Sequence, residues 1–187
     1  MDNLKTITAL GGMEPRVDIF DHVRITENDG LALASVAARI GHEKAVHAAL
    51  KKLLGDVPGP GRSQPRDPVE GFWMGPDQWM IGAPKATHEL LADQLKTLMG
   101  NAASVTEQSG AWVCFDVAGR GMLDMCELLC NVPIRTMVTC DAQRTVIQQL
   151  GCFVLRRAAD DHIRILGPRA SAGTLHHALL TTAKSTA

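Results

Sequence analysis

One order of segments occurs twice along this chain of 187 residues: a strand, a helix, a hairpin and a second helix. In the first half, the apolar segment 31–40 fits either a strand or a helix. The helix that follows it, between Gly41 and Gly55, has apolar residues at the spacing i, i+3, i+4, i+7, i+8. A hairpin at 72–81 and a helix that ends at Gly100 complete the unit. This order predicts a structure that mixes helices with strands.

The second half repeats the order with a strand at 112–115, a helix at 122–130, a hairpin at 151–166 and a last helix at about 171–183. The apolar stripe of its first helix matches that of the first half with a shift of 76 residues. Repetition at a fixed shift is the sequence signature of duplicated units.

The fold class predicted from this pattern is α+β. We expect two ferredoxin-like split units, each an antiparallel sheet covered by helices on one face. The pseudo-repeats would cover about 31–100 and 111–183 within a single domain, 1–187. Residues 1–30 are expected to be irregular, because they carry turn signals rather than apolar periodicity. The Pro- and Gly-rich stretch 56–68 is expected to be a surface loop that cannot join a sheet interior.

Charge and composition exclude two classes of protein. A net charge of -1 argues against a general nucleic-acid binder, which needs a surplus of Lys and Arg. No apolar run reaches the length required to cross a bilayer, so no membrane partner is expected. The amino terminus lacks the basic and apolar regions of a signal peptide, which predicts a cytoplasmic protein.

Histidine and cysteine pairs are the first places to look for a metal site. His42 and His47 are five residues apart, which separates them by about 140° around a helix, so they cannot coordinate one metal ion together. Adjacent His176 and His177 point to different sides of a helix and are expected at the surface or at an interface. No metal site is predicted from these histidines.

The five cysteines are an odd number in a chain without an export signal, which favours reduced thiols over disulfides. Cys126 and Cys130 have the i, i+4 spacing of a ligand pair, but they lie on an apolar stripe and no second pair accompanies them. We interpret them as core residues.

Nucleotide and catalytic motifs are also missing. Gly119-Arg120-Gly121 follows a strand and opens a helix, but Asp124 stands where a dinucleotide fingerprint has its third glycine. A tight structural turn is the better interpretation. The sequence contains no P-loop and no nucleophile elbow, and its carboxylates show no paired spacing. The prediction is therefore that this chain has no catalytic, cofactor-binding or metal residues of its own.

An interaction surface is the remaining candidate. Phe72, Trp73 and Trp79 gather within eight residues of a chain with few aromatics, around the turn 75–78, for which Pro76 fits a type I geometry. Strand alternation puts Phe72 and Trp73 on opposite faces, so one of them leaves the face that the other occupies. Trp73 and Trp79 either cap the core from this hairpin or anchor a partner, since Trp is enriched at interface centres. Phe72, Trp73 and Trp79 are therefore the candidate partner interface.

Three motifs resemble the gamma subunit of heterotetrameric sarcosine oxidase. The first is Gly75-Pro76-Asp77-Gln78-Trp79-Met80-Ile81, and the second is Thr106-Glu107-Gln108-Ser109-Gly110-Ala111-Trp112-Val113. The third is Gln143-Arg144-Thr145-Val146, followed by a hairpin and Leu166-Gly167-Pro168-Arg169. Their order and spacing span about 31–180, which is most of the chain.

The resemblance implies a duplicated α+β fold like the folate-binding domain of glycine-cleavage aminomethyltransferases. It implies that larger subunits hold FAD, FMN, NAD and tetrahydrofolate. The expected complex demethylates sarcosine to glycine, reduces oxygen to peroxide and passes the one-carbon unit to folate. The gamma subunit is not known for cofactor ligands, so the chain is expected to be a non-catalytic accessory subunit of this oxidoreductase.

A second hypothesis belongs to another class. The chain would then be a free-standing folate-binding or one-carbon transfer protein of the aminomethyltransferase type. That function requires a buried carboxylate to hold the pterin and a site for the amine. The small size of the chain and the lack of a catalytic cluster favour the subunit.

Overall fold

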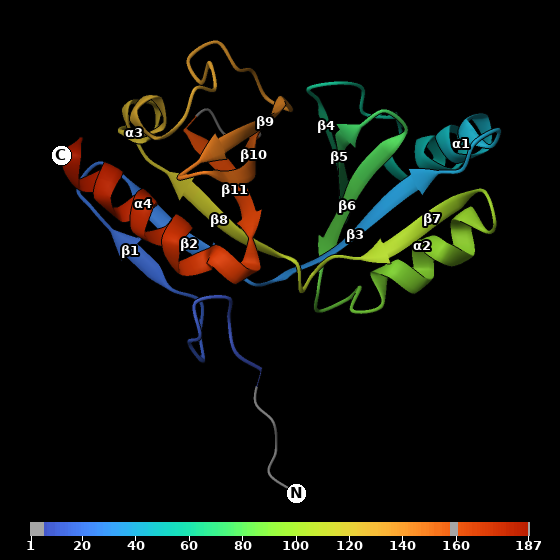
Figure 1. Ribbon diagram of the computed structural model, residues 1–187, viewed down its shortest axis with the longest axis horizontal. Coiled ribbons are helices and arrows are strands. Elements are labelled where there is room, and N and C mark those ends of the chain that lie inside the picture. The colour runs from blue at the N-terminus through green and yellow to red at the C-terminus, as the bar shows by residue number, and fades with distance from the viewer. Residues whose placement is uncertain (1–5, 158–160, 187) are drawn as a thin grey trace, which may run out of the picture. The chain divides into compact units, whose positions relative to one another are not determined.

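The computed structural model describes residues 6–157 and 161–186 (Figure 1). Within these residues the chain forms two antiparallel sheets with helices, so the α+β class is confirmed. The chain divides into two compact units. Unit 1 comprises 1–29, 111–139 and 143–187, and unit 2 comprises 30–110 and 140–142. No helix in the described part of the chain is both long and apolar enough to span a membrane.

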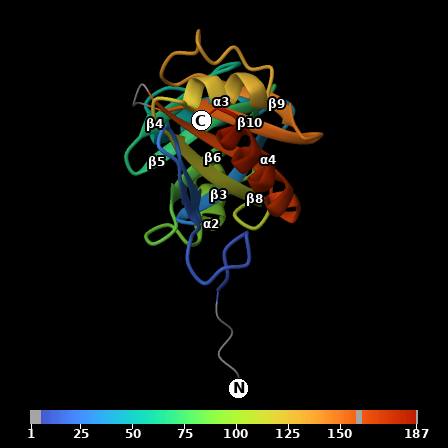
Figure 2. The same cartoon turned by 90° about the vertical axis from the view of Figure 1, so that its left-hand side faces the viewer.

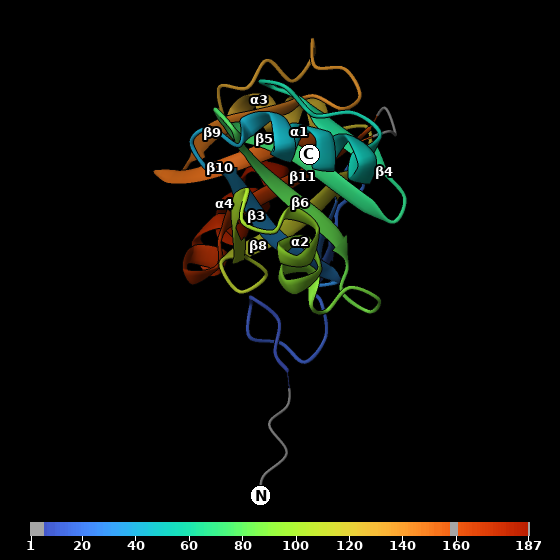
Figure 3. The ribbon, with the colours of Figure 1, turned by 90° about the vertical axis from the view of Figure 1, so that its right-hand side faces the viewer.

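Unit 2 is a five-stranded sheet with the order β4-β5-β6-β3-β7. Two helices lie on one face of this sheet (Figure 3) and contribute buried leucines such as Leu50 and Leu95 to a core that also contains Trp79. The elements of unit 2 are β3 Leu31–Ala38, α1 Glu43–Leu54, β4 Ser63–Arg66, β5 Val69–Gly75, β6 Gln78–Pro84, α2 Leu91–Met99 and β7 Ala103–Glu107.

Unit 1 is a six-stranded sheet with the order β1-β2-β8-β11-β10-β9. Helices α3 and α4 lie together on one face (Figure 2), over a core that includes Phe115, Met125 and Leu175. The elements of unit 1 are β1 Val17–Ile19, β2 Arg24–Asn28, β8 Trp112–Ala118, α3 Met122–Leu129, β9 Ala142–Ile147, β10 Leu150–Arg156, β11 His162–Pro168, the 3-10 turn η1 Arg169–Ser171 and α4 Ala172–Ser185.

The two sheets share one strand order. Reading unit 1 from its other edge gives β9-β10-β11-β8-β2, which corresponds to β4-β5-β6-β3-β7 in unit 2. In each unit one helix follows the strand that lies beside the three-stranded meander, β3 or β8, and a second helix follows the meander itself. The strand beside β3 is β7, which comes after α2, whereas the strand beside β8 is β2, from the start of the chain. The amino-terminal segment therefore completes the second sheet.

Several local expectations are corrected by the structure. The segment 31–40, which fits a strand or a helix by composition, forms strand β3. Residues 1–30 are not irregular throughout, because they contain β1 and β2. The stretch 56–68 is not loop throughout, because β4 runs through its second half with Pro65 opposite Glu70. An edge strand tolerates Pro, since one side of its backbone needs no partner.

Two further details differ. The φ of Asp77 is +54°, and a positive φ at this position of a turn after Pro76 belongs to type II rather than type I. Helix α3 ends at Leu129, and Cys130 already has extended backbone. The turn of the 151–166 hairpin includes residues 158–160, which lie outside the described residues.

Candidate functional site

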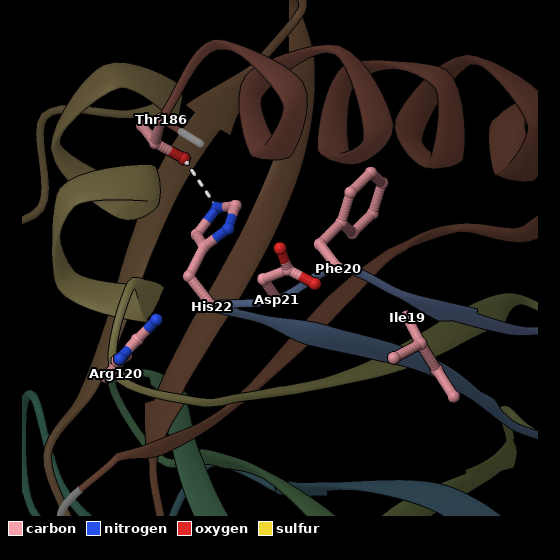
Figure 4. Close-up of a pocket in the computed structure, with 6 residues that line it drawn as sticks. All are labelled: Ile19, Phe20, Asp21, His22, Arg120 and Thr186. Atoms are coloured by element: carbon pink, nitrogen blue, oxygen red, sulfur yellow. Dashed lines mark hydrogen bonds between the residues drawn. The ribbon is translucent and has the colours of Figure 1, made fainter.

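An open pocket of about 600 Å³ lies in unit 1 where three segments meet (Figure 4). The segments are the loop between β1 and β2, the turn before α3 and the end of α4. Its lining residues are Ile19, Phe20, Asp21, His22, Arg120 and Thr186.

Two glycines bring the turn before α3 against His22. Gly119 has a φ of +127°, and a Cβ there would lie 2.5 Å from the His22 carbonyl oxygen. A Cβ on Gly121 would collide with the His22 ring, and the Gly121 N–H donates to the His22 carbonyl at 2.9 Å. The pattern Gly119-Arg120-Gly121 is therefore a turn fitted to a neighbouring loop, as its sequence interpretation expects.

The groups in this pocket suit binding better than catalysis. The His22 Nε2 atom lies 3.2 Å from Thr186 Oγ1, so the ring is already engaged (Figure 4). The side chains of Arg120 and Asp21 are exposed, with Ile19 and Phe20 as apolar neighbours. These charged and apolar side chains together can bind a charged and partly apolar segment at the surface of unit 1.

A second polar cluster lies on β8 and its neighbours. Arg164 donates from Nε and Nη2 to the Asp116 carboxylate at 2.8 and 3.1 Å, and Asn28 donates to it at 2.7 Å. His162 Nε2 lies 3.3 Å from the same carboxylate. Burial alone would raise the pKa of Asp116, but the hydrogen bonds from His162 and Arg164 outweigh it and hold that pKa well below its usual range. The cluster is internally satisfied.

Glu27 is a second enclosed carboxylate, with 2% of the residue exposed. It accepts hydrogen bonds from the backbone N–H groups of Leu10 and Arg16 at 2.9 and 3.1 Å. Glu27 therefore fixes the amino-terminal segment to β2. Like Asp116, it is committed to contacts within the chain.

The cysteines of unit 1 are packed thiols. Burial raises the pKa of Cys126 to about 12 and that of Cys152 to about 11, and it also raises the pKa of Cys130. Thiols with such pKa values are protonated at neutral pH and therefore weak nucleophiles. All five cysteines are free.

Metal-ligand residues do not converge in the described part of the chain, where no three His, Cys, Asp or Glu side chains are arranged to hold an ion. His47 instead lies 3.3 Å from Asp77, and its ring meets Trp79 edge-on at 5.1 Å between centroids. His176, expected at the surface, is buried and contacts Asp18.

The three residues predicted for a partner interface differ in exposure. Trp79 is 2% exposed and donates from Nε1 to the Pro58 carbonyl at 2.9 Å, so it belongs to the core of unit 2. Phe72 is also buried. Trp73 lies directly opposite Trp79 in the β5–β6 pair and is half-buried. Of the three, Trp73 therefore offers a partner the most accessible side chain.

Sequence analysis missed the Asp116 cluster and the His22 pocket. A signal for the cluster exists, since Asp116 and Arg164 each interrupt an apolar strand and lie opposite each other in the β8–β11 pair. The pocket has no comparable signal. Its residues come from three separate parts of the chain, and only the turn glycines mark the place.

Comparison with known proteins identifies solved structures that share this fold. No family model and no curated protein matches the sequence. Among solved structures, the chain has the α+β fold of the aminomethyltransferase class: it matches the glycine cleavage system aminomethyltransferase T from Bartonella henselae with a TM-score of 0.60 and 16% identity. That match covers 85% of this chain but 45% of the other, so the chain spans less than half of the enzyme's length.

A second match is more extensive. A chain of the heterotetrameric sarcosine oxidase from Corynebacterium sp. U-96, in complex with pyrrole 2-carboxylate, has a TM-score of 0.75 at 19% identity. The match covers 88% of this chain and 85% of that one. At the level of the fold, the resemblance expected from the sequence motifs is confirmed.

Proposed function

We propose that this chain is the small accessory subunit of a flavin-dependent sarcosine oxidase complex. The observation that carries the proposal is the mutual coverage with the sarcosine oxidase chain, 88% of one and 85% of the other. Two chains that cover each other this fully have about the same length. The aminomethyltransferase, by contrast, contains this fold as less than half of a longer chain.

The side chains support an accessory role over free-standing folate chemistry. A protein that holds a pterin by itself requires an available enclosed carboxylate. Asp116 is occupied by Arg164 and Asn28, and Glu27 is occupied by two backbone N–H groups. In this proposal the larger subunits carry FAD, FMN, NAD and tetrahydrofolate, and this chain contributes binding surface.

Co-expression with the larger subunits from the same source tests the proposal. We expect the chain to co-elute with them in gel filtration, and the assembled complex to show a flavin spectrum and to produce peroxide from sarcosine. The isolated chain is expected to be colourless and inactive. A flavin spectrum or sarcosine oxidation by the chain alone would contradict the accessory role.

Titration of the isolated chain with tetrahydrofolate in a calorimeter separates the two hypotheses. An accessory subunit gives no saturable heat. Stoichiometric binding at micromolar concentration would instead support a free-standing folate protein.

A further inference from the structure

One edge of the six-stranded sheet is strand β1, whose outer backbone groups have no partner strand within residues 6–157 and 161–186. Strand β1 lies at the edge and pairs with β2 in an antiparallel register that puts Asp18 opposite Ile25 (Figure 1). The Arg16 carbonyl accepts a hydrogen bond from the Glu27 N–H of β2 at 2.8 Å, and the Phe20 N–H donates to the Val23 carbonyl, just before β2, at 2.9 Å. Because backbone groups alternate in direction along a strand, those of Asp18 also point to β2. Val17 and Ile19 alternate with these residues, so their N–H and C=O groups point away from the sheet.

The side chains at the same two positions are apolar and exposed. Val17 is 41% exposed and Ile19 is 74% exposed. Both side chains lie on the face opposite Asp18, which points to α4 and bonds to His176. An edge strand with outward backbone groups and exposed apolar side chains is a template for another strand.

The pocket described above continues from this edge, since Ile19 is the last residue of β1 and lines the pocket together with Phe20, which follows it. Two cations flank it. Arg120 lines the pocket, and Arg24 lies opposite Ile19 in the β1–β2 pair. Both are exposed, and neither forms an ion pair with any residue in 6–157 or 161–186. Both guanidinium groups are therefore accessible to a carboxylate of a bound segment, and the pocket also has an exposed carboxylate of its own, Asp21.

We propose that β1 and the adjoining pocket bind an extended segment of a larger subunit. The segment adds a strand beside β1, places an apolar side chain against Ile19, and presents a carboxylate to Arg120 and Arg24. Backbone pairing gives affinity in this mode of recognition, and the pocket and charges give specificity. The identity of the partner rests on the proposed function, whereas the mode of binding rests on the geometry of unit 1.

Proline at position 19 tests the backbone pairing directly. Ile19→Pro removes an N–H that points outward and leaves the β1–β2 hydrogen bonds intact, which an edge strand tolerates. We expect association with the purified flavin-bearing subunits, measured by biolayer interferometry, to weaken by at least about tenfold. Arg120→Glu is expected to weaken it as well, and to make the remaining binding less sensitive to salt.

Val146→Lys is the matched control for Ile19→Lys. Val146 is 60% exposed on β9, which is the opposite edge strand of the same sheet. We expect Ile19→Lys to weaken association and Val146→Lys to leave it unchanged, with both variants melting like the wild type. Equal binding by wild type, Ile19→Pro and Ile19→Lys would overturn the inference about β1 and leave the accessory role intact. Failure of the wild type itself to associate would instead refute the accessory role.

Hydrogen exchange identifies what covers the edge. In the isolated chain we expect the amides of Val17 and Ile19 to exchange rapidly, and in the complex we expect them to be protected. Protection in the isolated chain that grows with concentration would mean that a second copy pairs there. Protection that persists on dilution would mean that another segment of the same chain covers the edge. Either result would overturn the proposed occupant.

Discussion

His176 and Asp18 join helix α4 to edge strand β1, with 2.7 Å between the imidazole Nε2 atom and the carboxylate Oδ2 atom. The His176 ring also stacks on Phe115, with 5.7 Å between ring centroids. Burial raises the pKa of Asp18, but the hydrogen bonds from His176 and Arg16 outweigh it, so the pKa lies below its ordinary value of 3.8. The contact holds β1 against the unit 1 core, while its other edge pairs with no strand in the part of the chain that the structure describes.

Stability should depend on the charge of Asp18 with a definite sign. A carboxylate whose pKa is lowered by folding stabilises the folded protein at pH values above the pKa that the group has in the unfolded chain. This stabilisation is lost as the pH falls through the pKa of the group in the folded protein. We therefore expect Asp18→Asn to lower the unfolding free energy by about 1 kcal/mol at pH 7, or about 2–4 °C in Tm. The difference from wild type should shrink below pH 3.8, as thermal melts across this range would show. Asp21→Asn, in the exposed neighbouring loop, should change little at either pH.

The Asp116 cluster should be far more sensitive to substitution than a surface ion pair. Arg164 is 7% exposed, so Asp116→Asn removes the carboxylate charge beside a buried guanidinium group, which costs about 3–5 kcal/mol. Asp124, whose side chain is 61% exposed, pairs with Arg135 at the surface, and its change to Asn should cost less than about 1 kcal/mol. Urea unfolding at pH 7 compares the two.

A double variant provides the internal check for this cluster. Asp116→Leu with Arg164→Met removes both charges, and we expect it to recover part of the stability that Asp116→Asn loses. A double variant that is less stable than the single one would show that the remaining partners, Asn28 and His162, govern the site.

Close contacts at two glycines give a third prediction. A Cβ on Gly71 would lie 2.7 Å from a Leu54 methyl carbon, and one on Gly167 would lie 2.5 Å from a Leu175 methyl carbon. Both leucines are fully buried, so we expect Gly71→Ala and Gly167→Ala to cost about 1–3 kcal/mol each by overpacking. Gly151→Ala in strand β10 meets nothing within 4 Å and should be neutral or slightly stabilising. Denaturation midpoints measure all three, and equal midpoints would contradict the predicted packing.

Substitutions in the turn between β9 and β10 should raise the stability of the fold. Gln148 and Gln149 have φ values of +49° and +65°, as a two-residue type I′ hairpin turn requires. Left-handed backbone costs an L residue about 1–2 kcal/mol, and Asn-Gly is the preferred pair for this turn. We expect Gln148→Asn with Gln149→Gly to stabilise the fold by about 1 kcal/mol. Gln94→Gly, in helix α2, should lower stability by a similar amount, so the sign of the change in Tm tests the turn assignment.

The sequence predicts the apolar elements of the fold well, because periodicity reports burial. The stripe in 41–55 and the apolar run at 112–115 correspond to α1 and β8. The elements that it misses lie at or next to sheet edges: β1, β2, β4, β7 and β9. Such strands are short and bury one face at most, as in β4, whose sequence Ser-Gln-Pro-Arg carries no apolar alternation. Pairing with a neighbour, rather than their own composition, makes them strands.

The candidate site is less accessible to sequence reasoning than the fold. The pocket requires His22, Arg120 and Thr186 to come together from positions up to 164 residues apart. Polar exposed residues have no periodicity that would reveal such proximity. A buried role for Trp79 could not be separated from an interface role by sequence, because a large aromatic residue beside a turn is compatible with both.

The final prediction concerns the paired tryptophans of the β5–β6 hairpin, Trp73 and Trp79. Trp79 is buried and bonded to Pro58, so Trp79→Ala should destabilise unit 2 by about 3–5 kcal/mol. Trp73 lies opposite it and is half-buried, which leaves part of its ring available to a partner. We expect Trp73→Ala to retain a folded circular dichroism spectrum and to weaken co-purification with the flavin-bearing subunits by about 2 kcal/mol or more, as at an interface hot spot. Phe72→Ala, also buried, should behave like Trp79→Ala. If Trp73→Ala assembles as tightly as the wild type, or if it unfolds with the other two, the hairpin serves the core of unit 2 alone.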